Sequence, residues 1–224
     1  MTQRGGKQVI PRAVRTREGN AAPWAGLDSD RRVLTLDEVR KRLALLPSPR
    51  PSEFDVAGSQ DAAVLVLLFE ERGEAHFVLT KRPETMPSHQ GEIAFPGGKR
   101  DPVDVDLLAA ALRETHEEIG VDACEVEVLG ELDGISTVAT RFTITPFVGV
   151  MAEPPTLVPD PREVAQALSV PISELLDPSI YREEQWELWG EWRPMAFFEL
   201  EGETVWGATA RILTGLLAFL VADR

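Results

Sequence analysis

The sequence is short of cysteine and of long apolar runs, and each shortage excludes a class of protein. Its 224 residues include one cysteine, Cys124, so an intrachain disulfide is excluded. A single thiol suits a reducing compartment, and we expect a cytoplasmic protein. The longest apolar candidate, residues 212–221, is shorter than the roughly 18 residues that a membrane span needs. The residues after Met1 are polar and basic, so we expect no secretory signal.

Positive charge is also scarce over most of the chain. The sequence has 23 Lys and Arg against 37 Asp and Glu, a formal net charge of -14. This balance argues against nonspecific nucleic-acid binding. The charge is uneven, because residues 1–50 carry a net +6 and the remainder a net -20. An anionic substrate that approaches the acidic part therefore needs a divalent metal and local basic residues.

The length and the 43% hydrophobic content fit one domain with extensions. Residues 1–32 are rich in Arg, Gly and small residues and show no periodicity, so we expect a mobile or loosely docked basic arm. Residues 33–224 are expected to form a single domain.

Two helices are predicted near the ends of this domain. Thr35 and Glu38 form a capping box, which predicts a helix over 35–46 that ends before Pro47. Residues 208–221 predict a closing helix, because their large apolar residues recur on one face.

Strands are predicted between the helices. Residues 62–69 and 75–80 read as a hairpin. Pro146 favours an edge or a bulge in the strand that contains it. Residues 163–168 read as a short helix. The remaining predicted strands cover residues 91–95, 124–132, 142–150, 193–200 and 204–206. This order of elements predicts an α+β fold.

One stretch carries the most chemistry. Gly97 and Gly98 read as a turn, and residues 107–119 predict a helix that Gly120 ends. At about 100° per residue, three glutamates of this helix share a face at spacings i, i+3 and i+4. They are Glu114, Glu117 and Glu118.

These carboxylates repel one another, since like charges at i, i+4 cost roughly 0.2–0.5 kcal/mol. A bound cation would remove the repulsion, and carboxylate oxygens suit hard ions such as Mg²⁺ or Mn²⁺. The alternative is a solvated acidic helix face, which is a common pattern.

The residues around the glutamates carry a family resemblance. FPGG at 95–98 is followed by RETHEEIGV at 113–121, which resembles the REUxEExGU motif of the Nudix box, where U is apolar. Thr115 stands at an apolar position, and the spacer is one residue longer than the commonest form. The acidic residue of the spacer is Asp104 or Asp106. The resemblance implies an α/β/α sandwich with a mixed sheet.

Segments outside the box resemble the coenzyme A pyrophosphatase branch of that family. These are VLTKR at 78–82, FPGG at 95–98 and WGATA at 206–210. The branch has a second arginine where this chain has Pro87, which removes a charge that grips phosphate. The resemblance spans about residues 62–220.

The resemblance implies roles for particular residues. Glu117 and Glu118 are expected to be the main ligands of Mg²⁺ or Mn²⁺, with Glu114 and the carbonyl of Gly98 as further ligands. Arg113 is expected to hold a glutamate in place rather than to touch substrate.

The general base is left open between two residues. Glu114 is one candidate, and Glu163 is the other. Glu163 reads equally as an acidic residue at a helix start, where the helix dipole favours it.

Substrate binding is expected to rest on basic residues near the box. The candidates are Lys81, Arg82, His89, Lys99 and Arg100. His89 could donate a hydrogen bond to phosphate or serve only the structure.

Three functions follow from these observations. The first is metal-dependent hydrolysis of the pyrophosphate of coenzyme A or acyl-coenzyme A, giving phosphopantetheine and adenosine bisphosphate. The second is hydrolysis of another nucleoside diphosphate derivative: a nucleotide sugar, a dinucleotide or an oxidised nucleotide. The third is a non-catalytic ligand sensor, against which the intact glutamates speak.

Three tryptophans lie close together in the sequence, at Trp186, Trp189 and Trp192. Burial in a core, cover for a homodimer interface and stacking on adenine are the alternatives.

Overall fold

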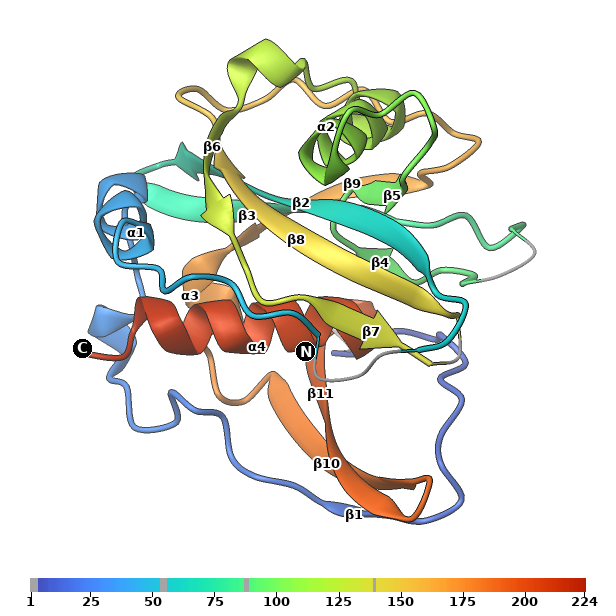
Figure 1. Ribbon diagram of the computed structural model, residues 1–224. Helices are drawn as coiled ribbons and strands as arrows, with labels where there is room; N and C mark the ends of the chain where they lie inside the picture. The colour runs from blue at the N-terminus through green and yellow to red at the C-terminus, as the bar shows by residue number, and fades with distance from the viewer. Residues whose placement is uncertain (1–3, 53–55, 87–88, 139) are drawn as a thin grey trace.

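The computed structural model describes residues 4–52, 56–86, 89–138 and 140–224. Pro87 therefore lies outside the described residues. The described chain forms three layers, an eight-stranded sheet between helices, and a fourth layer beyond one of the helix layers, which is a four-stranded sheet (Figure 1). Within those ranges no helix has the length and apolar character needed to cross a membrane.

The large sheet is mixed, as predicted. Its hairpin joins β2 (Gln60–Glu71) to β3 (Glu74–Lys81), and β8 (Phe142–Val150) runs parallel to β2. The order is β4-β3-β2-β8-β6, while β5 also pairs with β2, β7 with β8 and β9 with β3. The other strands are β4 (Ile93–Ala94), β5 (Gly97–Lys99), β6 (Glu127–Glu131), β7 (Ile135–Thr137) and β9 (Gln166–Pro171).

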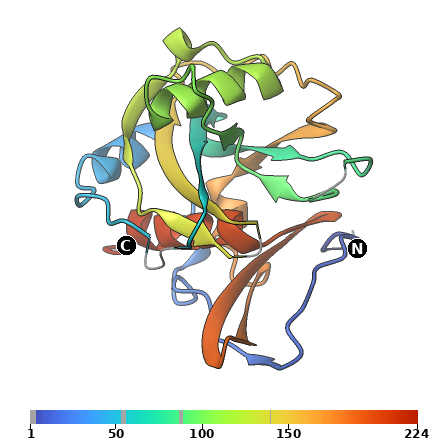
Figure 2. The same ribbon diagram turned by 45° about the vertical axis from the view of Figure 1, so that its right-hand side comes forward.

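Both faces of this sheet are covered, which explains why β2 is apolar without interruption. Leu65 and Leu67 pack in a cluster with α2 (Leu107–Ile119). Val66 and Leu68 point the other way, into a cluster with α1 (Leu36–Leu43) and α4 (Gly207–Leu220). Figure 2 shows the sheet between α2 and α4. Each buried leucine contributes about 1.5–3 kcal/mol, so the sheet is a firm base for α2.

The capping box predicted for α1 is present. The Thr35 hydroxyl accepts from the Glu38 amide, and the Glu38 carboxylate accepts from the Thr35 amide. The helix ends at Leu43, earlier than the predicted residue 46. The next turn is tighter, because the amides of residues 45 and 46 donate to carbonyls three residues back, at Arg42 and Leu43. Leu46 still packs against the core. The short α3 (Ile172–Leu175) connects the two sheets.

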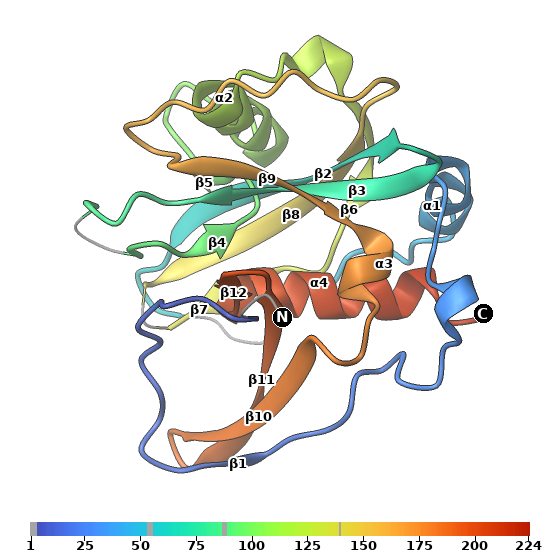
Figure 3. The ribbon, with the colours of Figure 1, turned by 180° about the vertical axis from the view of Figure 1, so that it is seen from behind.

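The small sheet was not expected as a separate layer. Its order is β1-β10-β11-β12, and β11 contacts α4. The strands are β1 (Thr16–Glu18), β10 (Tyr181–Leu188), β11 (Glu191–Leu200) and β12 (Glu203–Val205). Figure 3 shows it below α4, with β12 nearest the large sheet.

The N-terminal segment, for which we expect a mobile or loosely docked arm, packs against the domain. β1 pairs with β10, and Trp24 is only 3% exposed. The Trp24 ring lies 5.3 Å from Tyr181 and 6.1 Å from Phe198, centroid to centroid. A tryptophan buries a large apolar area in such a contact, which outweighs the low periodicity around it. Residues 16–32 are therefore docked on the domain.

Three local predictions were wrong. Gly97 and Gly98 are not a turn but lie in β5, paired with Val64 and Ala63 of β2. Pro146 lies in an interior strand, in the interval between the residues that pair with β6 and those that pair with β7. The proline therefore removes no ladder bond on that side. The predicted helix 163–168 is not helical, and β9 begins at Gln166 because the edge of β3 takes up that segment as a partner.

Candidate active site

Helix α2 begins and ends where the sequence predicts. The Asp106 carboxylate accepts from the Ala109 amide at 2.7 Å, and Gly120 ends the helix with φ 75°. Within the helix Thr115 is buried, but its hydroxyl donates to the Ala111 carbonyl at 2.7 Å. This bond satisfies a polar group at an apolar position.

The three glutamates of α2 have different surroundings. Glu118 faces the sheet and is 3% exposed, Glu114 is partly buried, and Glu117 points into solvent. One carboxylate oxygen each from Glu114, Glu118 and Glu163 lies within 4.8 Å of the others. The structure thus brings together two glutamates of the helix and the distant Glu163, while Glu117 stands outside this group.

Glu163 is held in place by the end of α2. The last carbonyls of a helix lack partners within it, and here the Val158 amide donates to Ile119 at 2.8 Å and the Asp160 amide to Glu118 at 2.9 Å. The Glu163 amide then donates to the Asp160 carbonyl at 3.0 Å. The loop is therefore fastened to the helix whose carboxylates Glu163 joins.

The electrostatics of the three-carboxylate group fit a hard cation. Burial raises the pKa of Glu118 to about 8, and burial also raises the pKa of Glu114. Among the described residues, Glu118 accepts a hydrogen bond from the Gly97 amide, at a long 3.4 Å. Buried carboxylates with spare lone pairs are the donors that Mg²⁺ and Mn²⁺ bind.

The glycines of β5 allow the sheet and the helix to approach. A Cβ on Gly97 would lie 2.3 Å from the Ala63 carbonyl oxygen, and its φ is 146°. A Cβ on Gly98 would lie 2.6 Å from the Glu114 carboxylate. Gly97 is required by its positive φ and by its contact with the backbone of β2, whereas a side chain on Gly98 would displace the flexible end of Glu114.

Arg113 joins Glu114 of this group to two carboxylates outside it. It donates to Asp104 at 2.9 and 3.0 Å, to Glu114 at 2.8 Å and to Glu117 at 2.8 Å. This guanidinium lowers the pKa of Asp104, which is buried. The sequence leaves open whether Asp104 or Asp106 is the acidic residue of the spacer, and the structure gives the two different contacts. Asp104 accepts from Arg113, and Asp106 caps the helix.

The basic residues expected at the substrate differ in availability. Lys81 is paired with Glu203 of β12. The Arg82 amide donates to the Glu92 carbonyl at 3.0 Å, and its buried Nε has no hydrogen-bond partner among the described residues. Arg82 also lies close enough to Glu118 to lower the pKa of that carboxyl.

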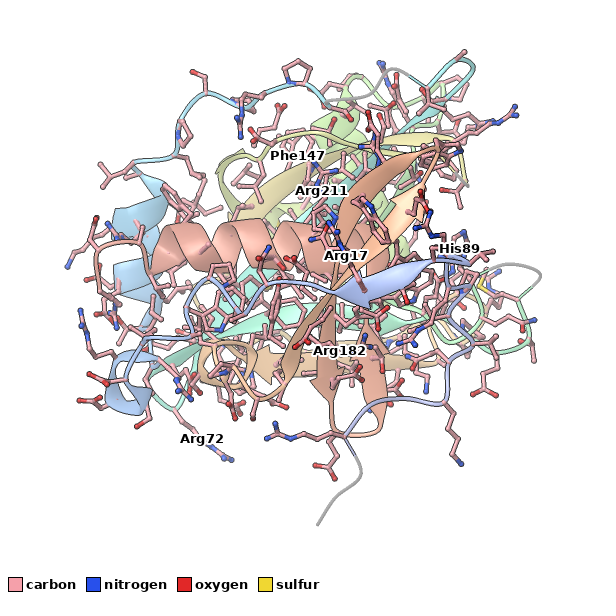
Figure 4. All side chains as sticks on the ribbon, turned by 90° about the horizontal axis from the view of Figure 1, so that it is seen from below. Arg17, Arg72, His89, Phe147, Arg182 and Arg211 are labelled. Atoms are coloured by element: carbon pink, nitrogen blue, oxygen red, sulfur yellow. The ribbon has the colours of Figure 1, made fainter. Side chains whose placement is uncertain are left out.

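His89 and Glu92 lie in the loop before the box. His89 Nδ1 lies 2.6 Å from a Glu92 carboxylate oxygen, which raises the pKa of the imidazole. The residue has φ 58° and lies on the side of the molecule away from α1 (Figure 4). Lys99 is exposed, while Arg100 donates to the carbonyls of the loop before α2.

The three tryptophans have separate environments. Trp186 is buried beside Phe197, and Trp189 is 69% exposed at the tip of the hairpin. Trp192 lies under the guanidinium groups of Arg15 and Arg17 at 5.6 and 4.3 Å. Trp186 therefore belongs to a core.

Sequence reasoning missed two residues beside this site. Glu203 reads only as part of a turn, yet it pairs with Lys81. Gln8 lies in the presumed arm, yet it donates to the Gly91 carbonyl at 3.1 Å. Neither has a local signal, because each depends on a partner far away in the chain.

Several known proteins are similar to this chain. The family model described as NUDIX domain matches residues 59–191. A protein of Enterobacter sp. (strain 638), described as uncharacterized Nudix hydrolase NudL, is 39% identical over 192 residues, covering 82% of this chain and 93% of the relative. One of the same description from Photorhabdus laumondii subsp. laumondii is 32% identical over 181 residues, covering 81% and 95%. The crystal structure of a Nudix hydrolase from M. smegmatis is 30% identical, with a TM-score of 0.42 over 54% of this chain and 74% of that one.

Proposed function

Since the chain belongs to the Nudix family and is a pyrophosphohydrolase, we propose that the bond it cleaves is the pyrophosphate of coenzyme A or an acyl-coenzyme A. The products are phosphopantetheine and an adenosine bisphosphate. The proposal includes a cytoplasmic location, which the single cysteine favours.

The placement of the segment before the box is the observation that supports this substrate. The VLTKR segment at 78–82, which resembles the coenzyme A branch, ends at Arg82, whose side chain lies near Glu118. Its buried Nε has a free N–H among the described residues. An arginine with a spare donor beside the carboxylate group is suited to a phosphate of the substrate.

We assign the metal to Glu114 and Glu118, whose oxygens converge with an oxygen of Glu163. Nudix hydrolases use divalent metals, and Mg²⁺ or Mn²⁺ is the ion that these donors favour. A bound divalent cation polarises phosphoryl oxygens and lowers the pKa of its water. In this proposal Gly98 gives the helix room, and Arg113 orients Glu114 and Glu117.

The proposed base is Glu163. It lies on a loop rather than on α2, so it can accept a proton from water without distorting the helix that holds the ion. Glu114 is the second candidate, but Arg113 already occupies one of its oxygens at 2.8 Å.

A second substrate class has a specific observation in its favour. Lys81, expected to bind phosphate, is neutralised by Glu203, and Pro87 replaces the arginine of the coenzyme A branch. Together these leave fewer cations than coenzyme A, with its additional phosphate, would use. A nucleotide sugar, a dinucleotide or an oxidised nucleotide is the alternative.

Product analysis tests the choice. The protein is incubated with Mg²⁺ or Mn²⁺ and coenzyme A, acetyl-coenzyme A, nucleoside triphosphates, a nucleotide sugar and a dinucleotide. Phosphopantetheine from coenzyme A, with little product from the rest, is the expected result. Turnover of another compound alone would reject the coenzyme A assignment.

Two variants test the metal assignment on whichever substrate is cleaved. Glu118→Gln keeps the shape of the side chain but removes a ligand, so most turnover should be lost while the fold stays intact. Glu125→Gln, an exposed glutamate beyond the helix, is the matched control and should keep full activity. Equal activity of Glu118→Gln and wild type would refute the metal site.

A further inference from the structure

The N-terminal segment lies against the strand of the small sheet that is nearest the large one. Gly6 donates its amide to the Thr204 hydroxyl at 2.9 Å. The Gln8 side chain pairs with the backbone of β12 in the way that a neighbouring strand pairs. Its Oε1 accepts from the Thr204 amide at 3.2 Å, and its Nε2 lies 3.3 Å from the Thr204 carbonyl oxygen. Figure 3 shows this segment beside β12 and β4.

The same amide nitrogen reaches the loop before the box. Gln8 Nε2 lies 3.1 Å from the Gly91 carbonyl oxygen and 3.1 Å from Glu203 Oε2. The other oxygen of Glu203 holds the Lys81 ammonium. The Lys81 and Glu203 side chains are 21% and 13% exposed, so the pair is mostly removed from solvent. One glutamine thus connects the small sheet, the loop and the end of β3.

This connection adjoins the proposed substrate residues. Lys81 precedes Arg82, whose amide donates to the Glu92 carbonyl beside Gly91. The Lys81 carbonyl accepts from the Ala165 amide at 2.8 Å, two residues after Glu163. A shift of this corner would therefore move Arg82 and the His89–Glu92 pair relative to the carboxylate group.

We propose that Gln8 and Glu203 are positioning residues for substrate binding. They fix Lys81 and the Gly91 end of the loop, so that Arg82 and His89 face the phosphates of the substrate. Lys81 is part of this hydrogen-bonded connection through Glu203 and does not bind phosphate itself. The inference rests on the proposed function, since it concerns the same site.

Two substitutions at Gln8 separate positioning from space-filling. Gln8→Ala removes the amide, and Gln8→Glu keeps its shape but replaces the donor with a charge facing Glu203 and two carbonyls. We expect KM to rise about three- to tenfold for Gln8→Ala, and further for Gln8→Glu, with kcat within about twofold of wild type. Gln60→Ala, at an exposed glutamine that begins β2, is the matched control and should leave KM unchanged. If Gln8→Ala does not fold, Gln8→Asn, which keeps the amide but shortens its reach, should show the same rise.

Hydrogen exchange gives a readout that needs no substrate. In both Gln8 variants the amides of Arg82 and Glu92, which bond within this corner, should exchange faster, while those of α2 should not change. Unchanged KM together with unchanged exchange would overturn the proposal, as would a fall in kcat with KM unaltered. If the wild type cleaves no compound of the panel, the proposed function fails, and the exchange result still decides whether Gln8 braces the loop.

Discussion

Replacing Glu118 by glutamine should change the pH dependence of stability in a defined direction when no metal is present. Burial raises the pKa of this carboxyl to about 8 in the folded protein, whereas an unfolded glutamate titrates at about 4.3. A group whose pKa is higher in the folded state stabilises the fold while it is protonated. That stabilisation is present below about pH 4.3 and is lost as the pH rises through about 8.

The size of the effect follows from the shift. One pKa unit corresponds to about 1.4 kcal/mol. Between about pH 5 and about pH 7 the Glu118 carboxyl is ionised in the unfolded chain but mostly protonated in the folded one, so the free energy of unfolding should fall by about 2.5 kcal/mol over this range. Glu118→Gln cannot ionise but retains an oxygen for the Gly97 amide. In a chelator-containing buffer the variant should therefore gain stability relative to wild type as the pH rises.

Urea unfolding of both proteins across this range measures the difference. Glu117→Gln is the matched control, because it removes an exposed carboxylate from the same helix. Mg²⁺ or Mn²⁺ should then stabilise the wild type, which regains a partner for its carboxylate, and should have little effect on Glu118→Gln. Parallel pH profiles of wild type and Glu118→Gln would refute the argument that burial controls this carboxyl.

Three further substitutions test other parts of the structure. Gly98→Ala should lower kcat/KM by more than about tenfold in a steady-state assay, because the methyl group would lie 2.6 Å from the Glu114 carboxylate. Glu163→Gln should lower kcat by about a hundredfold or more with an unchanged melting temperature; full activity would exclude it as the base. Trp24→Ala should lower the free energy of unfolding by about 3–5 kcal/mol in urea, whereas a solvated arm would give no change.

Elements with local signals were predicted closely from the sequence. Helix α2 begins after Asp106, whose carboxylate caps it, and ends at Gly120, whose positive φ only glycine adopts freely. Both signals lie within one turn of the helix end. The capping box of Thr35 and Glu38 placed α1 for the same reason.

Features that depend on distant partners were not predicted. Gly97 and Gly98 form a strand only because β2 offers them a free edge. Glu163 is a candidate base from the sequence, but its place beside the other carboxylates depends on carbonyls at the end of α2, which hold its loop. The pairing of Lys81 with Glu203 joins residues that are far apart in the chain. Periodicity reports which face of a segment is buried, but it does not report which other segment covers that face.

The pairing of β2 also has a consequence for folding. Its hairpin with β3 closes over two residues, whereas its parallel pairing with β8 joins residues that are about 80 positions apart. Long loops are closed late because their entropy must be lost before the contact forms. The loop that carries Glu163 follows β8 in the chain, so we expect the carboxylate group to assemble after the hairpin. During synthesis, this centre should gain metal affinity only when the second half of the chain has emerged.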